Sequence, residues 1–165
     1  MKAVDAIKQK IFTITPLCNQ VYAWKMKGKT VAFTNGCFDI LHEGHIFSLS
    51  QAAHAADYLI VGLNSDASTR ALKGPERPVN QEQSRALLLA SLAIVDAVII
   101  FDQPTPLELI TTIQPDVLVK GGDYTLEQIV GAKEVVAAGG KVVINPLVAG
   151  FSTTGLIARI KETLS

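Results

Sequence analysis

The sequence has few cysteines, no net charge and no long apolar run. Its two cysteines, Cys18 and Cys37, have no metal-site spacing and form no disulfide framework. Lysine plus arginine equal aspartate plus glutamate at 15 each, so no overall field attracts nucleic acid or an anionic membrane. We find no secretory signal, no repeat and no apolar stretch of about 18 residues. These absences predict a cytoplasmic protein that binds phosphate, if at all, through local geometry.

The pattern that is present alternates strands with helices. The chain has 165 residues, of which 48% are hydrophobic, which suits one domain with a real core. Five short runs rich in Val and Ile are expected strands: Thr30–Phe33, Tyr58–Leu63, Ala97–Phe101, Val117–Val119 and Lys141–Ile144. Expected helices are Gly44–Ala56, Gln81–Ile94, Pro106–Ile113, Leu126–Ala138 and Thr154–Thr163. The runs scarcely alternate, so we predict an α/β fold: a doubly wound, open, parallel five-stranded sheet with helices on both faces.

The first residues follow a different pattern. Apolar residues fall at helical spacing from Val4 to Ile14, and Pro16 interrupts them. We expect residues 1–28 to form an N-terminal extension of two short helices, and residues 29–165 to form the main domain. The extension either caps the domain's own core or contacts a second subunit.

The polar loops of this sheet are expected to converge. Ligands of doubly wound sheets bind beyond the carboxyl ends of the strands, where the strand order reverses. Four loops open at that edge: residues 35–45, 64–73, 120–124 and 150–154. Side chains distant in sequence should therefore meet in one site.

The first of these loops carries two histidines at the start of a helix. His42 and His45 share one face of a helical turn, and Gly44 between them allows close approach of a ligand. Free N–H groups of the first turn and two imidazoles would together bind a polyphosphate. Two other interpretations stay open: a metal-binding pair, or surface histidines without a role.

Other motifs carry similar alternatives. Residues 152–154, Ser-Thr-Thr, precede a helix, so they form either an ordinary N-cap or a second anion cradle. Lys73 lies on a loop rich in Gly and Pro and is either solvated or part of a lid over phosphates. Arg77 could serve the lid or the surface. Cys37 is interpreted first as a small filler and second as a reactive thiol.

These motifs together resemble a known family. Residues 34–45, Thr-Asn-Gly-Cys-Phe-Asp-Ile-Leu-His-Glu-Gly-His, resemble the HxGH signature of the cytidylyltransferase-like nucleotidyltransferases, and residues 151–154 resemble their second, Ser/Thr-rich element. Further matches occur in residues 64–66, 73–80 and 120–124 and at Arg85. This string is most similar to the adenylyltransferase half of the bacterial heptose-phosphate enzymes. The resemblance spans roughly residues 29–161.

The resemblance implies a Rossmann-like fold and a specific reaction. The expected reaction transfers AMP from ATP to a sugar 1-phosphate, D-glycero-β-D-manno-heptose 1-phosphate, and yields ADP-heptose and pyrophosphate for the lipopolysaccharide core. The catalytic residues it implies are His42, His45, Lys73 and Arg85. The implied nucleotide-binding residues are Thr34, Asn35, Gly36, Phe38, Asp39, Gly44, Gly121, Asp123, Ser152, Thr153 and Thr154. The implied substrate-binding residues are Asn64, Asp66, Lys120, Gly122 and Tyr124.

The resemblance also suggests cofactors and partners. Mg²⁺ is expected with ATP, and Asp39 is a possible ligand through water. A homodimer is expected, with a separate sugar kinase to supply the 1-phosphate. One alternative is a cytidylyltransferase for a small alcohol phosphate such as glycerol 3-phosphate. Its relatives carry an arginine just before the Ser/Thr-rich element, where residues 146–150 here contain no basic residue. The other alternative is a nucleotide-binding regulator without turnover.

Overall fold

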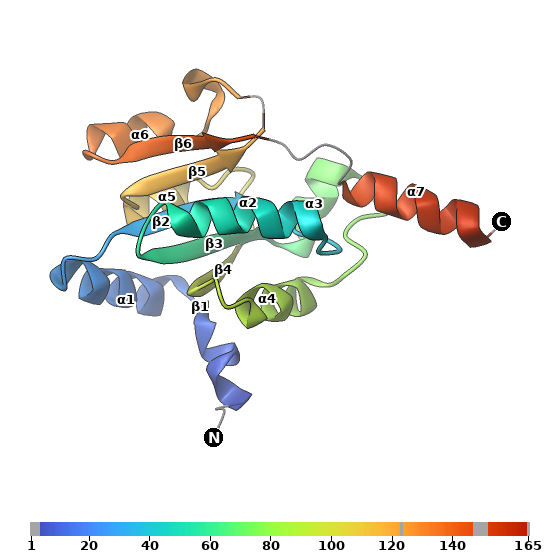
Figure 1. Ribbon diagram of the computed structural model, residues 1–165, viewed down its shortest axis with the longest axis horizontal. Coiled ribbons are helices and arrows are strands. Elements are labelled where there is room, and N and C mark those ends of the chain that lie inside the picture. The colour runs from blue at the N-terminus through green and yellow to red at the C-terminus, as the bar shows by residue number, and fades with distance from the viewer. Residues whose placement is uncertain (1–3, 123, 147–151, 165) are drawn as a thin grey trace.

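The computed structural model describes residues 4–122, 124–146 and 152–164, and it contains one parallel sheet of six strands (Figure 1). The strands are β1 (Ile11–Phe12), β2 (Val31–Gly36), β3 (Tyr58–Asn64), β4 (Ala97–Phe101), β5 (Val117–Gly121) and β6 (Lys141–Asn145). The α-helices are α1 (Ile14–Met26), α2 (Glu43–His54), α3 (Asp66–Lys73), α4 (Glu82–Ser91), α5 (Leu107–Ile113), α6 (Ala132–Ala137) and α7 (Thr153–Leu164). Short 3₁₀ turns are η1 (Val4–Ala6), η2 (Lys8–Lys10) and η3 (Leu126–Gln128).

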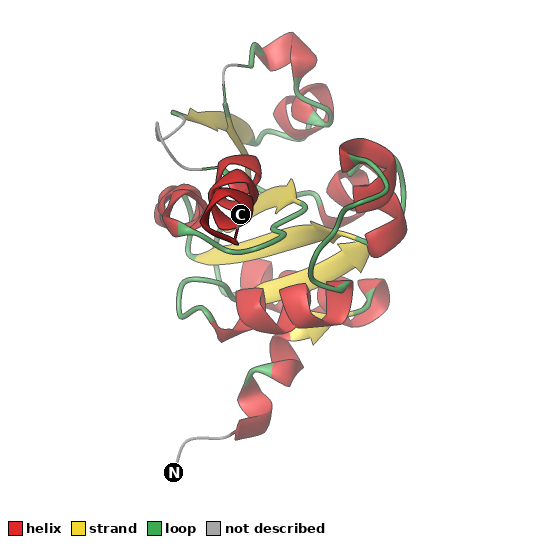
Figure 2. Ribbon diagram, turned by 90° about the vertical axis from the view of Figure 1, so that its right-hand side faces the viewer, coloured by secondary structure: helices red, strands yellow, loops and turns green. Residues whose placement is uncertain are grey.

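Helices cover both faces of the sheet, as the strand composition predicted (Figure 2). Helices α1, α5 and α6 pack on one face, where Trp24 stacks on Tyr58 with ring centroids 4.1 Å apart. Helices α2 and α4 pack on the other face through residues such as Leu49 and Leu89. Because both faces are covered, the central strands are apolar on both sides and nearly fully buried.

The strand order is β1-β4-β3-β2-β5-β6, and every neighbouring pair is parallel. From β2 the chain builds outward through β3 and β4, then returns to place β5 on the other side of β2. The order therefore reverses between β2 and β5. The carboxyl ends of these two strands, at Gly36 and Gly121, mark the expected ligand position.

The expectation of five strands misses β1. Only Ile11 and Phe12 form this strand, and they pair with Val98 and Ile99 of β4. Two residues are too short for a periodic signal, and they lie inside a helical spacing that continues from Val4. These two residues form a strand because the edge of β4 offers backbone N–H and C=O groups for pairing.

The rest of the N-terminal segment also differs from two short helices. Pro16 lies in the first turn of α1, where its missing N–H is not needed, so it begins a helix and does not interrupt one. Leu17, Val21 and Trp24 of α1 are buried in the core. The first residues thus belong to the same core as the sheet, while the division of the chain into domains stays a prediction.

Two further segments depart from the expected elements. Residues 66–73, expected as loop, form α3, because Ser65 caps the helix by accepting a hydrogen bond from the Ser68 N–H at 3.0 Å. The helix expected over residues 126–138 is divided into η3 and α6, with Gly131 at φ +85° between them. In the ranges that the structure describes, no helix is long and apolar enough to cross a membrane.

Candidate functional site

A cleft of about 650 Å³ opens at the carboxyl ends of β2 and β5. Predicted residues that line it are Thr34, Asn35, Gly36, Phe38, Asp39, His42, Gly44, His45, Asn64, Lys73, Lys120, Gly121, Tyr124, Ser152, Thr153 and Thr154. They come from five separate parts of the chain, as the convergence of loops at a switch point requires. The two imidazoles and the hydroxyl-rich start of α7 therefore border the same cleft.

The histidine pair occupies the start of α2. His42 is the N-cap residue and His45 lies in the first turn, with ring centroids 3.8 Å apart and stacked at 23°. The Nδ1 atom of each ring is buried and has no hydrogen-bond partner among the described residues. Buried polar atoms of this kind are costly without a partner, so each nitrogen calls for a bound water or a ligand.

Both imidazoles are neutral near pH 7. The pKa of His45 is lowered to about 4, first by burial and then by the neighbouring His42, while Asp39 opposes the shift. Burial also lowers the pKa of His42. A neutral imidazole still offers one N–H donor, and its other ring nitrogen can accept a hydrogen bond or a proton.

A strained loop brings the histidines into place. Phe38 and Ile40 both have φ of +43°, a conformation that residues with side chains seldom adopt. The ring of Phe38 lies over Gly36, where a Cβ atom would stand only 3.0 Å from Cε2. Phe38 also contacts His45, with ring centroids 5.4 Å apart. Gly36 therefore permits the turn that orients His45.

At the start of α7, Ser152 forms the N-cap that its position suggested, and its role as an anion cradle stays a prediction. Its Oγ accepts a hydrogen bond from the Gly155 N–H at 3.0 Å, which makes it an N-cap of α7. Ser152 also lines the cleft together with Thr153 and Thr154. A helix start with hydroxyl groups is a favourable environment for an anion.

Lys120 supplies a partly buried cation. Its Nζ lies 3.5 Å from Asn35 Oδ1 and 5.9 Å from the centre of the Tyr124 ring. Burial of the ammonium group lowers the pKa of Lys120; the charge of Lys73 also lowers it, while Cys37 opposes the shift. An anionic ligand would relieve this unfavourable burial.

Asp39 is buried and already accepts three hydrogen bonds. It accepts hydrogen bonds from Arg77 Nε at 2.6 Å and from the N–H groups of Val79 and Asn80 at 2.8 and 3.0 Å. Burial alone would raise the pKa of Asp39, but these three donors outweigh it and hold the pKa below its ordinary value. The residues that the structure describes contain no cluster of three metal-ligating side chains.

Arg85 is not in the cleft, although the sequence predicted a phosphate contact for it. Its side chain is fully buried at 0% exposure. It donates to the carbonyl of Asn80 at 2.9 Å, to the carbonyl of Cys37, and to Asp66 Oδ1 at 2.8 Å. Asp66, predicted to bind substrate, is thereby the partner of Arg85 and does not line the cleft. Arg85 is thus buried in the interior, while the Asp66 side chain remains 29% exposed, and the phosphate and substrate roles of the two residues stay predictions.

Two more predicted residues differ from the rest. Gly122 does not line the cleft. It has φ of +125°, and a Cβ atom added to it would stand only 2.8 Å from Tyr124 Cε2, so it makes room for the Tyr124 ring instead. Asp123 lies outside the described residues. The cleft also contains Ser48 and Leu72, which the sequence did not single out, together with Cys37 and Arg77.

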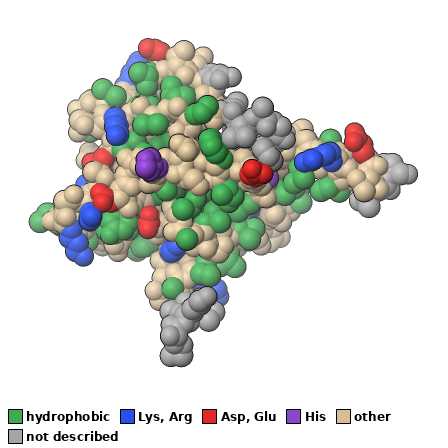
Figure 3. Space-filling view, viewed as in Figure 1, with side chains coloured by type: hydrophobic (Ala, Val, Ile, Leu, Met, Phe, Trp, Pro, Cys, Tyr) green, Lys and Arg blue, Asp and Glu red, His purple; other side chains and the backbone are tan. Residues whose placement is uncertain are grey.

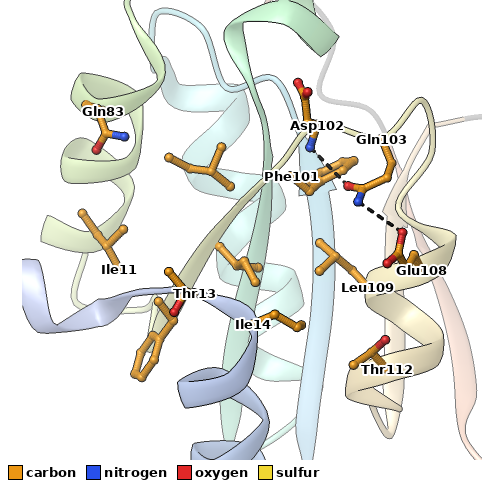
Figure 4. Close-up of a pocket in the computed structure, with 13 residues that line it drawn as sticks. Ile11, Thr13, Ile14, Gln83, Phe101, Asp102, Gln103, Glu108, Leu109 and Thr112 are labelled. Carbon is orange, nitrogen blue, oxygen red and sulfur yellow. Dashed lines mark hydrogen bonds between the residues drawn. The ribbon is translucent and has the colours of Figure 1, made fainter.

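A second cavity, of about 540 Å³, lies at the β1 edge of the sheet. Its walls are mostly apolar, and its rim contains Asp102 and Glu108, which are linked through Gln103 (Figure 4). Among the described residues, no Lys, Arg or His lines it. On the face in Figure 3, basic and acidic side chains are interspersed. Of these two cavities, the histidine cleft is the one suited to a nucleotide.

Comparison with known proteins agrees with this geometry. The chain is 59% identical over 143 residues to the bifunctional protein HldE of Hyphomonas neptunium, and 60% identical over 142 residues to that of Caulobacter vibrioides. These alignments cover 87% and 86% of this chain but only 29% of each relative, so the chain spans less than a third of their length.

Solved structures agree as well. A lipopolysaccharide core biosynthesis protein from Thermoplasma volcanium superposes with a TM-score of 0.60 at 27% identity, covering 73% of this chain and 98% of that one. Pantoate-beta-alanine ligase from Francisella tularensis, at a TM-score of 0.59 and 18% identity over 82% of this chain and 66% of that one, shares the fold. The cytidylyltransferase-like family model matches residues 33–159. Since that match spans most of the chain and includes both sides of the cleft, the protein belongs to the cytidylyltransferase-like family.

Proposed function

We propose that this chain is an adenylyltransferase that transfers AMP from ATP to D-glycero-β-D-manno-heptose 1-phosphate. The products are ADP-heptose, for the lipopolysaccharide core, and pyrophosphate. The family, the identity of 54–60% to bifunctional HldE proteins and the motif string in residues 34–45, 73–80 and 120–124 support this reaction.

One observation carries the proposal. Two stacked, neutral imidazoles with unpartnered buried nitrogens border the same cleft as the hydroxyl-rich start of α7. A cleft with donors from both the imidazoles and the start of α7 suits an extended, anionic molecule. A nucleoside triphosphate has that shape and charge.

In the proposed mechanism an oxygen of the sugar phosphate attacks the α-phosphorus of ATP in line, and the bond to the bridging oxygen breaks to release pyrophosphate. The attacking phosphate is already ionised near neutral pH, so no general base is needed. His42 and His45 donate N–H groups to the phosphoryl oxygens, whose charge they stabilise in the transition state. Lys73 and residues 152–154 bind the pyrophosphate end. Lys120, beside Asn35 and Tyr124, binds the acceptor phosphate.

Magnesium belongs to the substrate in this proposal. The oxygens of Asp39 are engaged by three donors, so Asp39 is a poor water-mediated ligand. We infer that Mg²⁺ enters bound to the phosphates of ATP.

The experiment measures pyrophosphate release. The protein is incubated with ATP or CTP and with the heptose 1-phosphate or glycerol 3-phosphate. We expect pyrophosphate release only when ATP is combined with the heptose 1-phosphate, and none with the other three substrate pairs. Release with CTP and glycerol 3-phosphate would instead indicate the cytidylyltransferase reaction. ATP binding by calorimetry without release from any acceptor would indicate a nucleotide-binding regulator.

The proposal also implies partners. A sugar kinase must form the 1-phosphate that this reaction uses. We further propose a homodimer, for which exposed apolar side chains such as Tyr22 and Met26 on α1 offer surface. Sedimentation equilibrium tests this, and a monomer at every concentration would contradict it.

A further inference from the structure

The loop between α3 and α4 carries an arginine in a position that the reaction does not yet use. Arg77 lines the cleft, and its side chain is 14% exposed. Its Nε donates the 2.6 Å hydrogen bond to Asp39. Its two terminal nitrogens have no hydrogen-bond partner in the part of the chain that the structure describes. An arginine held at one edge keeps four N–H donors for a second anion.

The loop that carries Arg77 is fixed to the histidine loop at two points. Asp39 binds the N–H groups of Val79 and Asn80 as well as Arg77. Arg85 donates hydrogen bonds to the carbonyls of both Cys37 and Asn80 and so links the two loops. The position of Arg77 is therefore set relative to residues 37–39.

The fixed guanidinium differs from the other cations of the cleft. Lys73 is exposed at the end of α3, and an ammonium group on a long stem offers charge without fixed direction. Arg77 is paired with a carboxylate, so it adds less net charge but presents a planar fork in a set orientation. Such a fork binds two phosphate oxygens at once.

We propose that Arg77 binds the phosphates of the nucleotide directly, and that Asp39 is a positioning residue that orients Arg77. This rests on the proposed function for the identity of the nucleotide. It assigns the phosphate-binding arginine to the loop after α3, because Arg85 is fully engaged in the interior and residues 146–150 contain no basic residue.

The test compares binding of ATP and adenosine by calorimetry in the wild type, Arg77→Gln and Arg70→Gln. Arg70 is a matched control, an exposed arginine on α3 outside the cleft. We expect Arg77→Gln to weaken ATP binding by about ten- to a hundredfold and to leave adenosine binding within about twofold, since only a phosphate contact is lost. Arg77→Lys should recover only part of the affinity. Unchanged ATP affinity in Arg77→Gln would overturn the proposal.

The role of Asp39 is tested with Asp39→Asn and the double variant. If Asp39 acts through Arg77, the double variant should bind ATP no more weakly than Arg77→Gln alone. Fully additive losses would overturn the positioning role. Melting curves report whether Asp39→Asn folds, and if it does not, Asp39→Glu replaces it in the same cycle.

The two proposals can fail separately. Pyrophosphate release by the wild type together with unaltered ATP binding in Arg77→Gln would refute only the role of Arg77. Absence of pyrophosphate release, with ATP binding that depends on Arg77, would refute only the transferase.

Discussion

At the scale of single residues, the cleft depends on side chains whose protonation is set by burial. His45 is kept neutral because burial lowers its pKa to about 4, and Lys120 is destabilised as a cation for the same reason. Both groups gain from an anion that enters the cleft, since a phosphate oxygen accepts from the imidazole and pairs with the ammonium. Substitutions of His45 and of Lys120 are therefore expected to have distinct effects on catalysis.

Replacing His45 by Ala should lower kcat by about 10²-fold or more, because a transition-state donor is removed. Steady-state pyrophosphate release measures this. His54→Ala at the other end of α2 is the control and should keep wild-type turnover. Wild-type kcat in His45→Ala would contradict the role of the imidazole.

Replacing Lys120 by Met should raise KM for the sugar 1-phosphate about tenfold, with a smaller effect on KM for ATP, because a charged hydrogen bond to the acceptor is lost. Lys133→Met, an exposed lysine on α6, serves as control. A larger change in KM for ATP than for the acceptor would assign Lys120 to the nucleotide instead.

The histidine pKa also predicts how stability depends on pH. The unfolded chain protonates His45 near pH 6.5 and the folded chain only near 4. Between these values the unfolded state binds more protons, so the free energy of unfolding falls as the pH is lowered through this window. Urea titrations at about pH 7 and about pH 4.5 should show a smaller loss in His45→Gln than in the wild type, by about 1–3 kcal/mol. Equal losses in the two proteins would show that His45 is not buried as described.

At the scale of elements, the sequence predicted the strands and helices that have a clear apolar pattern. It did not predict elements that are very short, or polar side chains that are buried. The strands β2 to β6 were predicted because apolar runs of this kind are distinctive. Strand β1 has two residues and no such signal, and α3 is polar with few apolar positions. Arg85 resembled a surface residue because sequence shows its charge and not the three partners that satisfy it.

The interior position of Arg85 predicts a structural cost. Replacing it by Met leaves two carbonyls and Asp66 without a donor, so unfolding free energy should fall by about 3–5 kcal/mol. Chemical denaturation measures this, with Arg70→Met on the exposed face of α3 expected to change stability by less than about 0.5 kcal/mol. A loss of phosphate affinity without a loss of stability would restore the role first predicted for Arg85.

At the scale of the whole molecule, the reversal of strand order explains why the site could be predicted from sequence better than its supports. Motifs at residues 34–45, 73–80, 120–124 and 152–154 are widely separated, but parallel topology sends each to the same edge of the sheet. That rule depends on connectivity and not on side-chain detail. The buried hydrogen bonds of Asp39 and Arg85 depend on the positions of individual side chains, so they could not be predicted from the sequence.

The position of α7 has a further consequence. This helix extends away from the body, and only its first residues border the cleft (Figure 1). A triphosphate held by the imidazoles at one end and by residues 152–154 at the other would tether the C-terminal helix to the sheet. Trypsin should therefore cut at the exposed Arg159 more slowly, by about fivefold or more, when ATP is present at about a hundred times its Kd. Equal cleavage with and without ATP would mean that α7 is secured by other means, and nucleotide occupancy would then leave no trace in the protease resistance of this end of the chain.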